Sequence, residues 1–370
     1  MKLGITGASG FIGYHLSHSL DKCRDGYSVL TCGRAAFYDD VKIREFVSAC
    51  DCIVHLGGEN TGAPEEVYAE NMRITRQLLG ALEETSFCGR LIFASSNHEY
   101  RGTRYGDSKR ESRLLFQEFA SITGALFHGL IIPNVYGPFC RPHYNSVVAT
   151  FCHDLTHGRK PQIKVDAEIE LVYVNELISQ IIACIDGDVK DVQVDVVPTA
   201  LRKVSDVLGM LARFKKLYFD SGQIPNLDDA FKTSLFSTFQ SYMDVSVHPV
   251  ALVTHDDERG SLCEVVKGTQ EGGQVFFSTT QPGATRGQHF HTRKFERFVV
   301  VKGKGLIRLR QIGQSKVYEI PVCGDAPAVV DIPVWFTHSI TNVGTESLLT
   351  VFFSDEVFDP SDADTYEKEV

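Results

Sequence analysis

The chain has 370 residues, 43% of them hydrophobic and 23% charged, so it is long enough for two or three globular domains. Its net charge of -10 argues against nucleic acid as a partner, because no Lys/Arg run offsets repulsion from phosphates. No apolar run approaches the ~20 residues that span a bilayer, so no membrane association is expected. The sequence leaves no room for a signal peptide before its first strand, and its ten cysteines form no C-x-x-C pair. We therefore expect a cytoplasmic protein with reduced thiols.

A short buried strand, a glycine-rich turn and a helix are predicted at the start of the sequence, with the strand over residues 2–6 and the helix running to about Leu20. The glycines permit a tight turn, close approach of the backbone to a pyrophosphate, and close packing of helix on strand. The phosphates would lie at the helix N-terminus, where free N–H groups favour anions. The predicted cofactor-binding residues of this turn are Gly7, Ser9, Gly10, Phe11, Ile12 and Gly13.

Three further strands are predicted over residues 27–32, 52–56 and 90–96, with helical segments between them. Arg34 follows the first of these, at the place where an acidic residue would favour NAD and an arginine can accommodate the extra phosphate of NADP. We interpret Arg34 as a marker of NADP, the alternative being a solvated surface arginine. Leu56, at the end of the next strand, is a further predicted cofactor contact. The alternation predicts a parallel, doubly wound α/β sheet with ligands at the carboxyl ends of its strands.

Tyr105 and Lys109 are the catalytic candidates of this first part. Residues four apart share one face of a helix, so the Lys109 ammonium is expected next to the phenol, where it can lower the phenol's pKa. A phenol tuned in this way can protonate a carbonyl oxygen as hydride arrives. The alternative is a solvated helix face, which the preceding glycine turn and Ser-Ser strand end make less attractive.

These motifs resemble the extended short-chain dehydrogenase/reductase family over residues 1–245. The family's catalytic serine, which hydrogen-bonds the reacting oxygen, maps onto Ser96, with Ser95 as the alternative. Asn134, in the segment Ile-Pro-Asn-Val-Tyr-Gly-Pro, matches a position that commonly contacts a nucleotide sugar. The resemblance implies a Rossmann-like fold and a nicotinamide-dependent reductase.

From residue 246 onward the chain alternates in the manner of strands, with glycine-containing turns, and predicts a small all-β barrel. Residues 283–303 fit the pattern G-x5-H-x-H-x4-E-x6-G, and a later segment supplies one more histidine. Residues two apart on a strand face the same way, so these side chains can converge inside the barrel. The predicted metal ligands are His289, His291, Glu296 and His338. Three imidazoles and a carboxylate suit Zn, Mn, Fe or Ni, and we take Zn as the first choice.

This double pattern resembles the cupin motifs, and the domain is accordingly expected to span residues 246–370. The segment Asp-Glu-Arg-Gly-Ser-Leu-Cys-Glu, with Arg259 and Glu264, and the later Arg286 resemble the sugar-nucleotide 3,5-epimerases. In that family the arginines hold the nucleotide diphosphate and a histidine at the position of His289 is a general base. We prefer the ligand role for His289, because the other ligands complete a metal set.

The fusion of a reductase with a metal-type cupin resembles the bifunctional enzymes of capsular polysaccharide synthesis over the full chain. That resemblance implies epimerisation at carbon 3 of a UDP-linked 4-keto-6-deoxy-N-acetyl sugar in the barrel. Reduction of the 4-ketone with NADPH would follow in the first domain, giving UDP-N-acetyl-6-deoxy-L-talosamine on the route to UDP-N-acetyl-L-fucosamine. The alternative is a reductase of single function whose cupin only dimerises or senses a ligand. A homodimer is expected by analogy with both parent families.

Overall fold

The computed structural model describes residues 1–23, 26–187, 189–244, 252–269 and 272–370. They form two compact units, one of Met1–Ala212 with Asp228–Met243 and the other of Arg213–Leu227 with Asp244–Val370. The predicted domain boundary at residues 245 and 246 lies outside the described residues.

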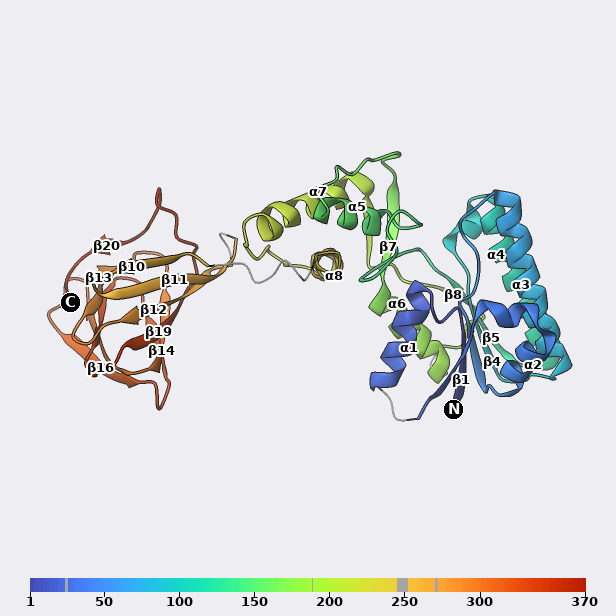
Figure 1. Cartoon of the computed structure of the whole chain (residues 1–370), viewed down its shortest axis with the longest axis horizontal. Helices are drawn as coiled ribbons and strands as arrows, with labels where there is room; N and C mark the ends of the chain where they lie inside the picture. The colour runs from blue at the N-terminus through green and yellow to red at the C-terminus, as the bar shows by residue number, and fades with distance from the viewer. Residues whose placement is uncertain (24–25, 188, 245–251, 270–271) are drawn as a thin grey trace. The chain divides into compact units, whose positions relative to one another are not determined.

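The first unit is built on a parallel sheet of six strands, which confirms the predicted doubly wound fold (Figure 1). In spatial order the strands are β2 (Ser28–Cys32), β1 (Lys2–Thr6), β3 (Cys52–His55), β4 (Arg90–Ala94), β5 (Leu126–Ile131) and β8 (Gln193–Asp195). Every neighbouring pair is parallel. The central strand β3 is covered on both faces and is buried throughout. A strand buried on both faces needs apolar residues at successive positions, which accounts for its run of Cys, Ile and Val.

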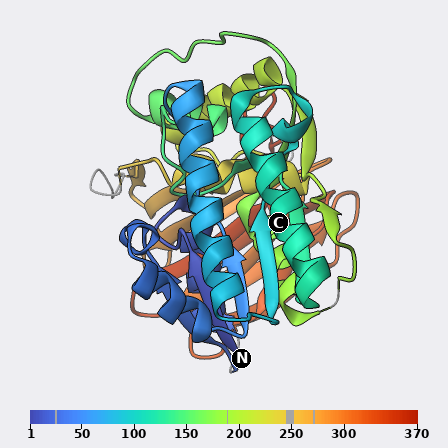
Figure 2. The same cartoon turned by 90° about the vertical axis from the view of Figure 1, so that its right-hand side faces the viewer.

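Helices cover both faces of this sheet, as Figure 1 shows. One face carries α1 (Phe11–Cys23) and α6 (Val174–Asp186), and the other carries α2 (Asp40–Ser48), α3 (Pro64–Glu84) and α4 (Arg104–Thr123). Figure 2 shows α3 and α4 side by side in blue and teal. Successive strand residues point to opposite faces, so Val54 packs with Leu16 of α1 while Ile53 packs with Leu78 of α3.

Smaller elements complete the first unit beside the carboxyl ends of the main strands. They are η1 (Arg34–Tyr38), η2 (Asn97–Tyr100), α5 (Val147–Thr156), α7 (Val204–Phe214), α8 (Ala230–Gln240) and a sheet of β6 (Asn134–Tyr136), β7 (Glu168–Tyr173) and β9 (Ala200–Lys203). Parallel pairing of β6 with β7 holds Asn134 opposite Leu171.

The second unit is an antiparallel β-barrel of two sheets, which confirms the predicted all-β cupin fold. One sheet contains β10 (Thr254–Asp257), β11 (Gly260–Lys267), β12 (Gln274–Thr280), β19 (Leu348–Ser354), β14 (Glu296–Lys302) and β17 (Val329–Ile332). The other contains β16 (Val317–Cys323), β15 (Lys304–Gln311), β18 (Phe336–Asn342), β13 (Thr285–Phe290) and β20 (Tyr366–Glu367). Its core includes Phe298, Ile307 and Ile340, which alternate along their strands with outward-facing residues.

Residues 213–227, which include the last two residues of α7, belong to this second unit, although the sequence pattern placed them with the first. They contain the irregular helix η3 (Lys215–Phe219). The amide of Ile224 donates to the backbone oxygen of Lys267 on β11 at 2.7 Å, and this long-range bond is invisible in the local apolar spacing.

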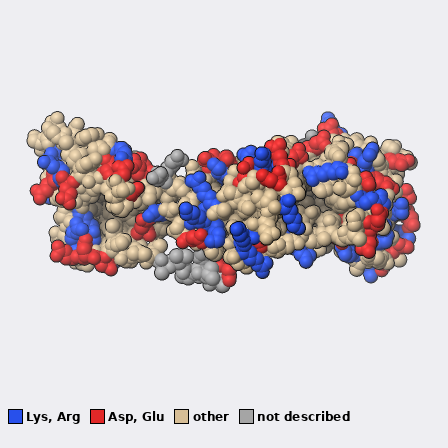
Figure 3. All heavy atoms as spheres, turned by 90° about the horizontal axis from the view of Figure 1, so that it is seen from above, with Lys and Arg blue, Asp and Glu red and all other residues tan. Residues whose placement is uncertain are grey.

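One face of the molecule shows how its charged side chains are distributed, and the described helices can be compared with the requirements of a membrane span. On the face that Figure 3 shows, basic and acidic side chains are interspersed. Among the described residues, no helix combines the length and apolar character needed to cross a lipid bilayer.

Candidate active site and metal centre

A cavity of about 620 Å³ opens in the first unit at the carboxyl ends of β1 and β3. The sheet order reverses here, since the chain runs from β1 to β2 on one side and returns to β3 on the other. Ligands of doubly wound sheets bind at such a switch point. A Cβ added at Gly13 would lie 2.3 Å from the Gly7 oxygen, so the turn tolerates only glycine where helix α1 meets the strand.

Nearly all residues predicted to bind cofactor or substrate in this unit line the cavity. They are Gly7, Ser9, Gly10, Phe11, Ile12, Gly13, Leu56, Ser96, Tyr105, Lys109 and Asn134. Arg34 is not among the lining residues. Its exposed guanidinium lies 2.9 Å from the carboxylate of Glu59, which does line the cavity.

Tyr105 and Lys109 both reach the cavity from the first turns of α4, whose start is fixed by Thr103 accepting from the Gly106 amide. The expectation that Lys109 lowers the pKa of Tyr105 is wrong for this arrangement. Burial raises the pKa of Tyr105 to about 12, and a hydrogen bond with Ser96 offsets this only in part. The Lys109 ammonium lies 6.0 Å from the centre of the phenol ring and donates to the Ala94 oxygen, so it influences the phenol weakly.

The two serines after β4 have different surroundings. Ser95 is buried and its hydroxyl donates to the carboxylate of Glu99, which also accepts two hydrogen bonds from the Nε of Arg113 and one from its Nη2. Ser96 lies beside the phenol of Tyr105 and lines the cavity. Of the two serines, Ser96 is therefore the one positioned next to the acid candidate.

Two cavity residues were not found from the sequence. The His98 ring packs edge-on against Tyr105 with 5.7 Å between ring centres. The Tyr144 hydroxyl donates to Glu59 at 3.1 Å, across a sequence separation of 85 residues. Neither belongs to a spacing motif, so no local signal identifies them.

The predicted metal ligands converge inside the barrel of the second unit. His289 and His338 are paired residues on the adjacent strands β13 and β18, and their ring centres lie 4.5 Å apart. Glu296 begins β14, and its Oε2 lies 3.3 Å from His291 Nε2 and 3.1 Å from His338 Nε2. One ligand atom from each of the four residues lies within 4.8 Å of every other. A bulge in β13 between Gly287 and His289 adjusts the strand at this point.

The polar atoms of this cluster are suited to a metal. Within the described part of the chain, His291 Nε2, His338 Nε2 and Glu296 Oε2 are buried without a hydrogen-bond partner. Burial lowers the pKa of His289 to about 4, with His338 adding to the effect, so this imidazole is neutral. Burial opposes ionisation of Glu296, yet the close imidazoles of His291 and His338 hold its pKa below its usual value. Neutral imidazoles and an ionised carboxylate are the protonation states that bind a divalent cation.

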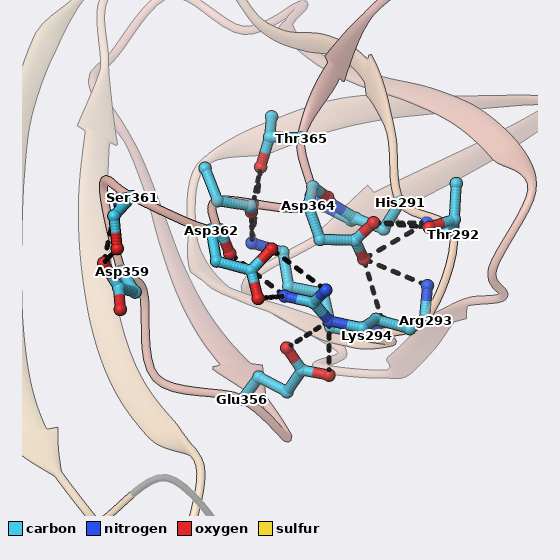
Figure 4. Close-up of polar contacts among 11 residues, drawn as sticks. His291, Thr292, Arg293, Lys294, Glu356, Asp359, Ser361, Asp362, Asp364 and Thr365 are labelled. Carbon is cyan, nitrogen blue, oxygen red and sulfur yellow. Dashed lines mark hydrogen bonds and ion pairs between the residues drawn. The ribbon is translucent and has the colours of Figure 1, made fainter.

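Asp364, near the end of the sequence, contacts His291 and the turn that follows this histidine, as Figure 4 shows. The Asp364 carboxylate accepts from the amides of Thr292, Arg293 and Lys294, which form the turn between the second histidine and the glutamate. Its backbone oxygen lies 2.6 Å from His291 Nδ1. A carbonyl oxygen can only accept, so Nδ1 carries the proton and Nε2 faces the cluster.

Asp364→Ala is expected to weaken metal binding by about 10- to 100-fold, because release of the turn frees the His291 ring. Competition with a chromophoric chelator on the full chain measures this. Asp362→Ala is the matched control, since Asp362 is exposed and pairs only with Arg293 among these residues. Equal affinities for wild type and Asp364→Ala would contradict a positioning role.

Two of the three predicted substrate residues of this unit are brought together. The carboxylate of Asp257 lies 2.6 Å from the Arg259 guanidinium and 3.4 Å from that of Arg286. Glu264 instead lies on β11 and pairs with Lys267 at 3.5 Å. The structure therefore groups the two arginines and leaves Glu264 outside their network.

Each of the two units matches the model of a known protein family. Residues 3–196 match the model of the NAD dependent epimerase/dehydratase family, and residues 255–366 match the polysaccharide biosynthesis C-terminal domain. The chain belongs to the NAD dependent epimerase/dehydratase family, whose enzymes use a nicotinamide cofactor.

Two relatives match along almost their whole length. The chain is 33% identical to the UDP-2-acetamido-2,6-beta-L-arabino-hexul-4-ose reductase of Pseudomonas aeruginosa, with 99% of this chain and 98% of that protein covered. The crystal structure of the capsular polysaccharide assembling protein CapF from Staphylococcus aureus matches with a TM-score of 0.87 and 32% identity, covering all of both chains. The resemblance to two-domain capsular polysaccharide proteins is thereby confirmed.

Proposed function

We propose that this chain is a bifunctional sugar-nucleotide enzyme. Its barrel epimerises carbon 3 of a UDP-2-acetamido-2,6-dideoxy-4-keto-hexose, and its first unit reduces the 4-ketone with NADPH. The product is UDP-N-acetyl-6-deoxy-L-talosamine, an intermediate on the route to UDP-N-acetyl-L-fucosamine and capsular polysaccharide. The observation that carries the proposal is full-length similarity to a 4-ketose reductase in a chain with polar groups gathered in both units.

Tyr105 is the proposed proton donor of the reduction. A phenol whose pKa is about 12 is fully protonated at neutral pH, so it can give its proton to the ketone oxygen as hydride reaches carbon 4. Ser96 would hydrogen-bond the same oxygen. Asn134, held on β6 where its amide donates to the Glu170 oxygen, would contact the substrate from the far side of the cavity.

NADPH is proposed over NADH because Arg34 follows the second strand, β2. Arg34 is largely exposed, and its guanidinium pairs with the carboxylate of Glu59. A 2′-phosphate could replace that partner, and a guanidinium binds phosphate through paired hydrogen bonds. Comparison of kcat/KM for the two cofactors tests this, and Arg34→Ala should then lose the preference for NADPH.

The barrel is the proposed site of epimerisation. A ketone at carbon 4 acidifies the proton on carbon 3, so a base can remove that proton and return it from the other face. His289, His291, Glu296 and His338 would hold a divalent cation, most simply Zn, which stabilises negative charge developing on an oxygen. Arg259 and Arg286 would bind the diphosphate of the substrate. Subsequent reduction of the ketone makes the epimerisation irreversible in practice.

Deuterium exchange tests the division of labour. The UDP-4-keto sugar is incubated with enzyme in deuterated water without NADPH and followed by proton NMR. Deuterium at carbon 3 is expected, and it should disappear with His289→Ala. No exchange with wild type would overturn independent epimerisation and favour a reductase whose cupin only dimerises or senses a ligand.

The pH dependence of reduction should report Lys109. Burial lowers the pKa of Lys109 to about 8, against the opposing influence of Glu99, so the ammonium loses its proton as pH rises through that value. If the ammonium assists hydride transfer, kcat falls above about pH 8. Lys109→Met should be slower throughout and lack this alkaline limb. A wild-type profile that is flat from about pH 7 to about pH 10 would contradict the assignment.

A further inference from the structure

A second cluster of metal-ligating side chains lies in the first unit, outside every residue considered so far. It consists of His143 from the loop 139–146, and of His153 and Asp154 on α5. Their ligand atoms all lie within 4.8 Å of one another. The cluster belongs to neither the reductase motif nor the barrel motif.

The distances within the cluster suit a small transition-metal ion. Asp154 Oδ1 lies 3.1 Å from His143 Nε2 and 3.7 Å from His153 Nδ1. Two ligand atoms that are each ~2.1 Å from a tetrahedral zinc ion lie roughly 3.4 Å apart, which falls between these values. Two imidazole nitrogens and one carboxylate oxygen are ligands that Zn, Co and Ni accept.

Two of the three potential ligand atoms are buried polar atoms without a hydrogen bond in the described part of the chain. Within the described residues, His153 Nδ1 and Asp154 Oδ1 are buried and lack a hydrogen-bond partner. Asp154 is 91% buried, so its carboxylate oxygen is shielded from solvent that could otherwise satisfy it. His143 Nε2 lies close to Asp154 Oδ1, but the two atoms do not form a hydrogen bond. A cation placed among the three atoms would satisfy both.

The position of the cluster links it to the reductase cavity. The His143 backbone has φ of 54°, a conformation uncommon outside glycine, and its amide donates to the Thr150 hydroxyl on α5. Neighbouring loop residues, including Arg141 and Tyr144, line the cavity. An ion shared by His143 and α5 would therefore fix the loop that forms one wall of the cavity.

We propose that His143, His153 and Asp154 form a second binding site for a zinc-class divalent cation, which fastens the loop 139–146 to α5 beside the cavity. The site is separate from the barrel cluster and independent of the identity of the sugar. Its role is to position the loop, including Tyr144, and no chemical step passes through the ion.

Zinc stoichiometry of the untagged full chain tests the site, with zinc alone as the probe. After equilibrium dialysis in zinc-buffered solution, elemental analysis should find two ions per wild-type chain and one in His143→Ala or Asp154→Asn. His143 is half exposed and should tolerate alanine, while asparagine keeps the shape of Asp154. His18→Ala, which removes an exposed histidine of α1, should still bind two.

The barrel site is distinguished by His338→Ala, which should also retain one ion, lost only when it is combined with His143→Ala. A stoichiometry unchanged by His143→Ala and by Asp154→Asn would overturn the proposal, leaving the cluster as a histidine–aspartate ion pair. Chymotryptic cleavage after the exposed Tyr144 of the loop gives a second readout. Zinc should slow it in wild type and have no effect in His143→Ala, whereas equal rates in both proteins would remove the loop-fastening role.

Discussion

Tyr105→Phe should reduce kcat for 4-ketone reduction by about 10²- to 10⁴-fold, the range that general acid catalysis contributes. The substitution deletes only the hydroxyl, so the ring can still pack against His98 and the fold should be kept. NADPH oxidation under single-turnover conditions measures the loss.

The same variant should keep deuterium exchange at carbon 3, because that reaction is assigned to the other unit. Tyr100→Phe is the matched control, since this exposed tyrosine on η2 is outside the cavity lining. Reduction by Tyr105→Phe at the wild-type rate would assign the proton donor to another group, with His98 the nearest candidate on geometry.

His338→Ala should abolish both metal binding in the barrel and exchange at carbon 3. Loss of an outer partner alone weakens metal binding by up to ~100-fold, so loss of a direct ligand should exceed that. Elemental analysis and proton NMR provide the two measurements. NADPH binding by the first unit should be unchanged.

Because His338 is almost wholly buried, alanine leaves a cavity that could unfold the barrel. Glu296→Gln is the second variant, since it preserves volume and removes the charge that pairs with His291 and His338. Circular dichroism checks that both variants are folded. Exchange that persists in a folded, metal-free variant would show that the metal is structural, and a non-ligand side chain would then be the base.

The strand limits, the glycine turn and the residues of the barrel cluster could be predicted from local sequence patterns. The strands that precede Gly7 and Ser95 begin and end within two residues of their predicted limits, because buried parallel strands need unbroken apolar runs. The glycine turn was equally visible, since close approach of backbones leaves no room for a Cβ at Gly13. The four residues that converge in the barrel could be picked out as candidate ligands, because strand periodicity and motif spacing are both properties of short segments.

Contacts between distant segments could be resolved only in the tertiary structure. The choice of Ser96 depends on the burial of Ser95 against Glu99, and the pKa of Tyr105 depends on burial rather than on the nearby lysine. Asp364 acts on a turn some 70 residues earlier, and His143 meets Asp154 through the path of a loop. The two folds and the candidate residues at motif spacing could be predicted from short stretches of the sequence. Tertiary structure decided protonation, partners and the second histidine cluster, because burial and long-range hydrogen bonds follow from packing rather than from neighbours in the chain.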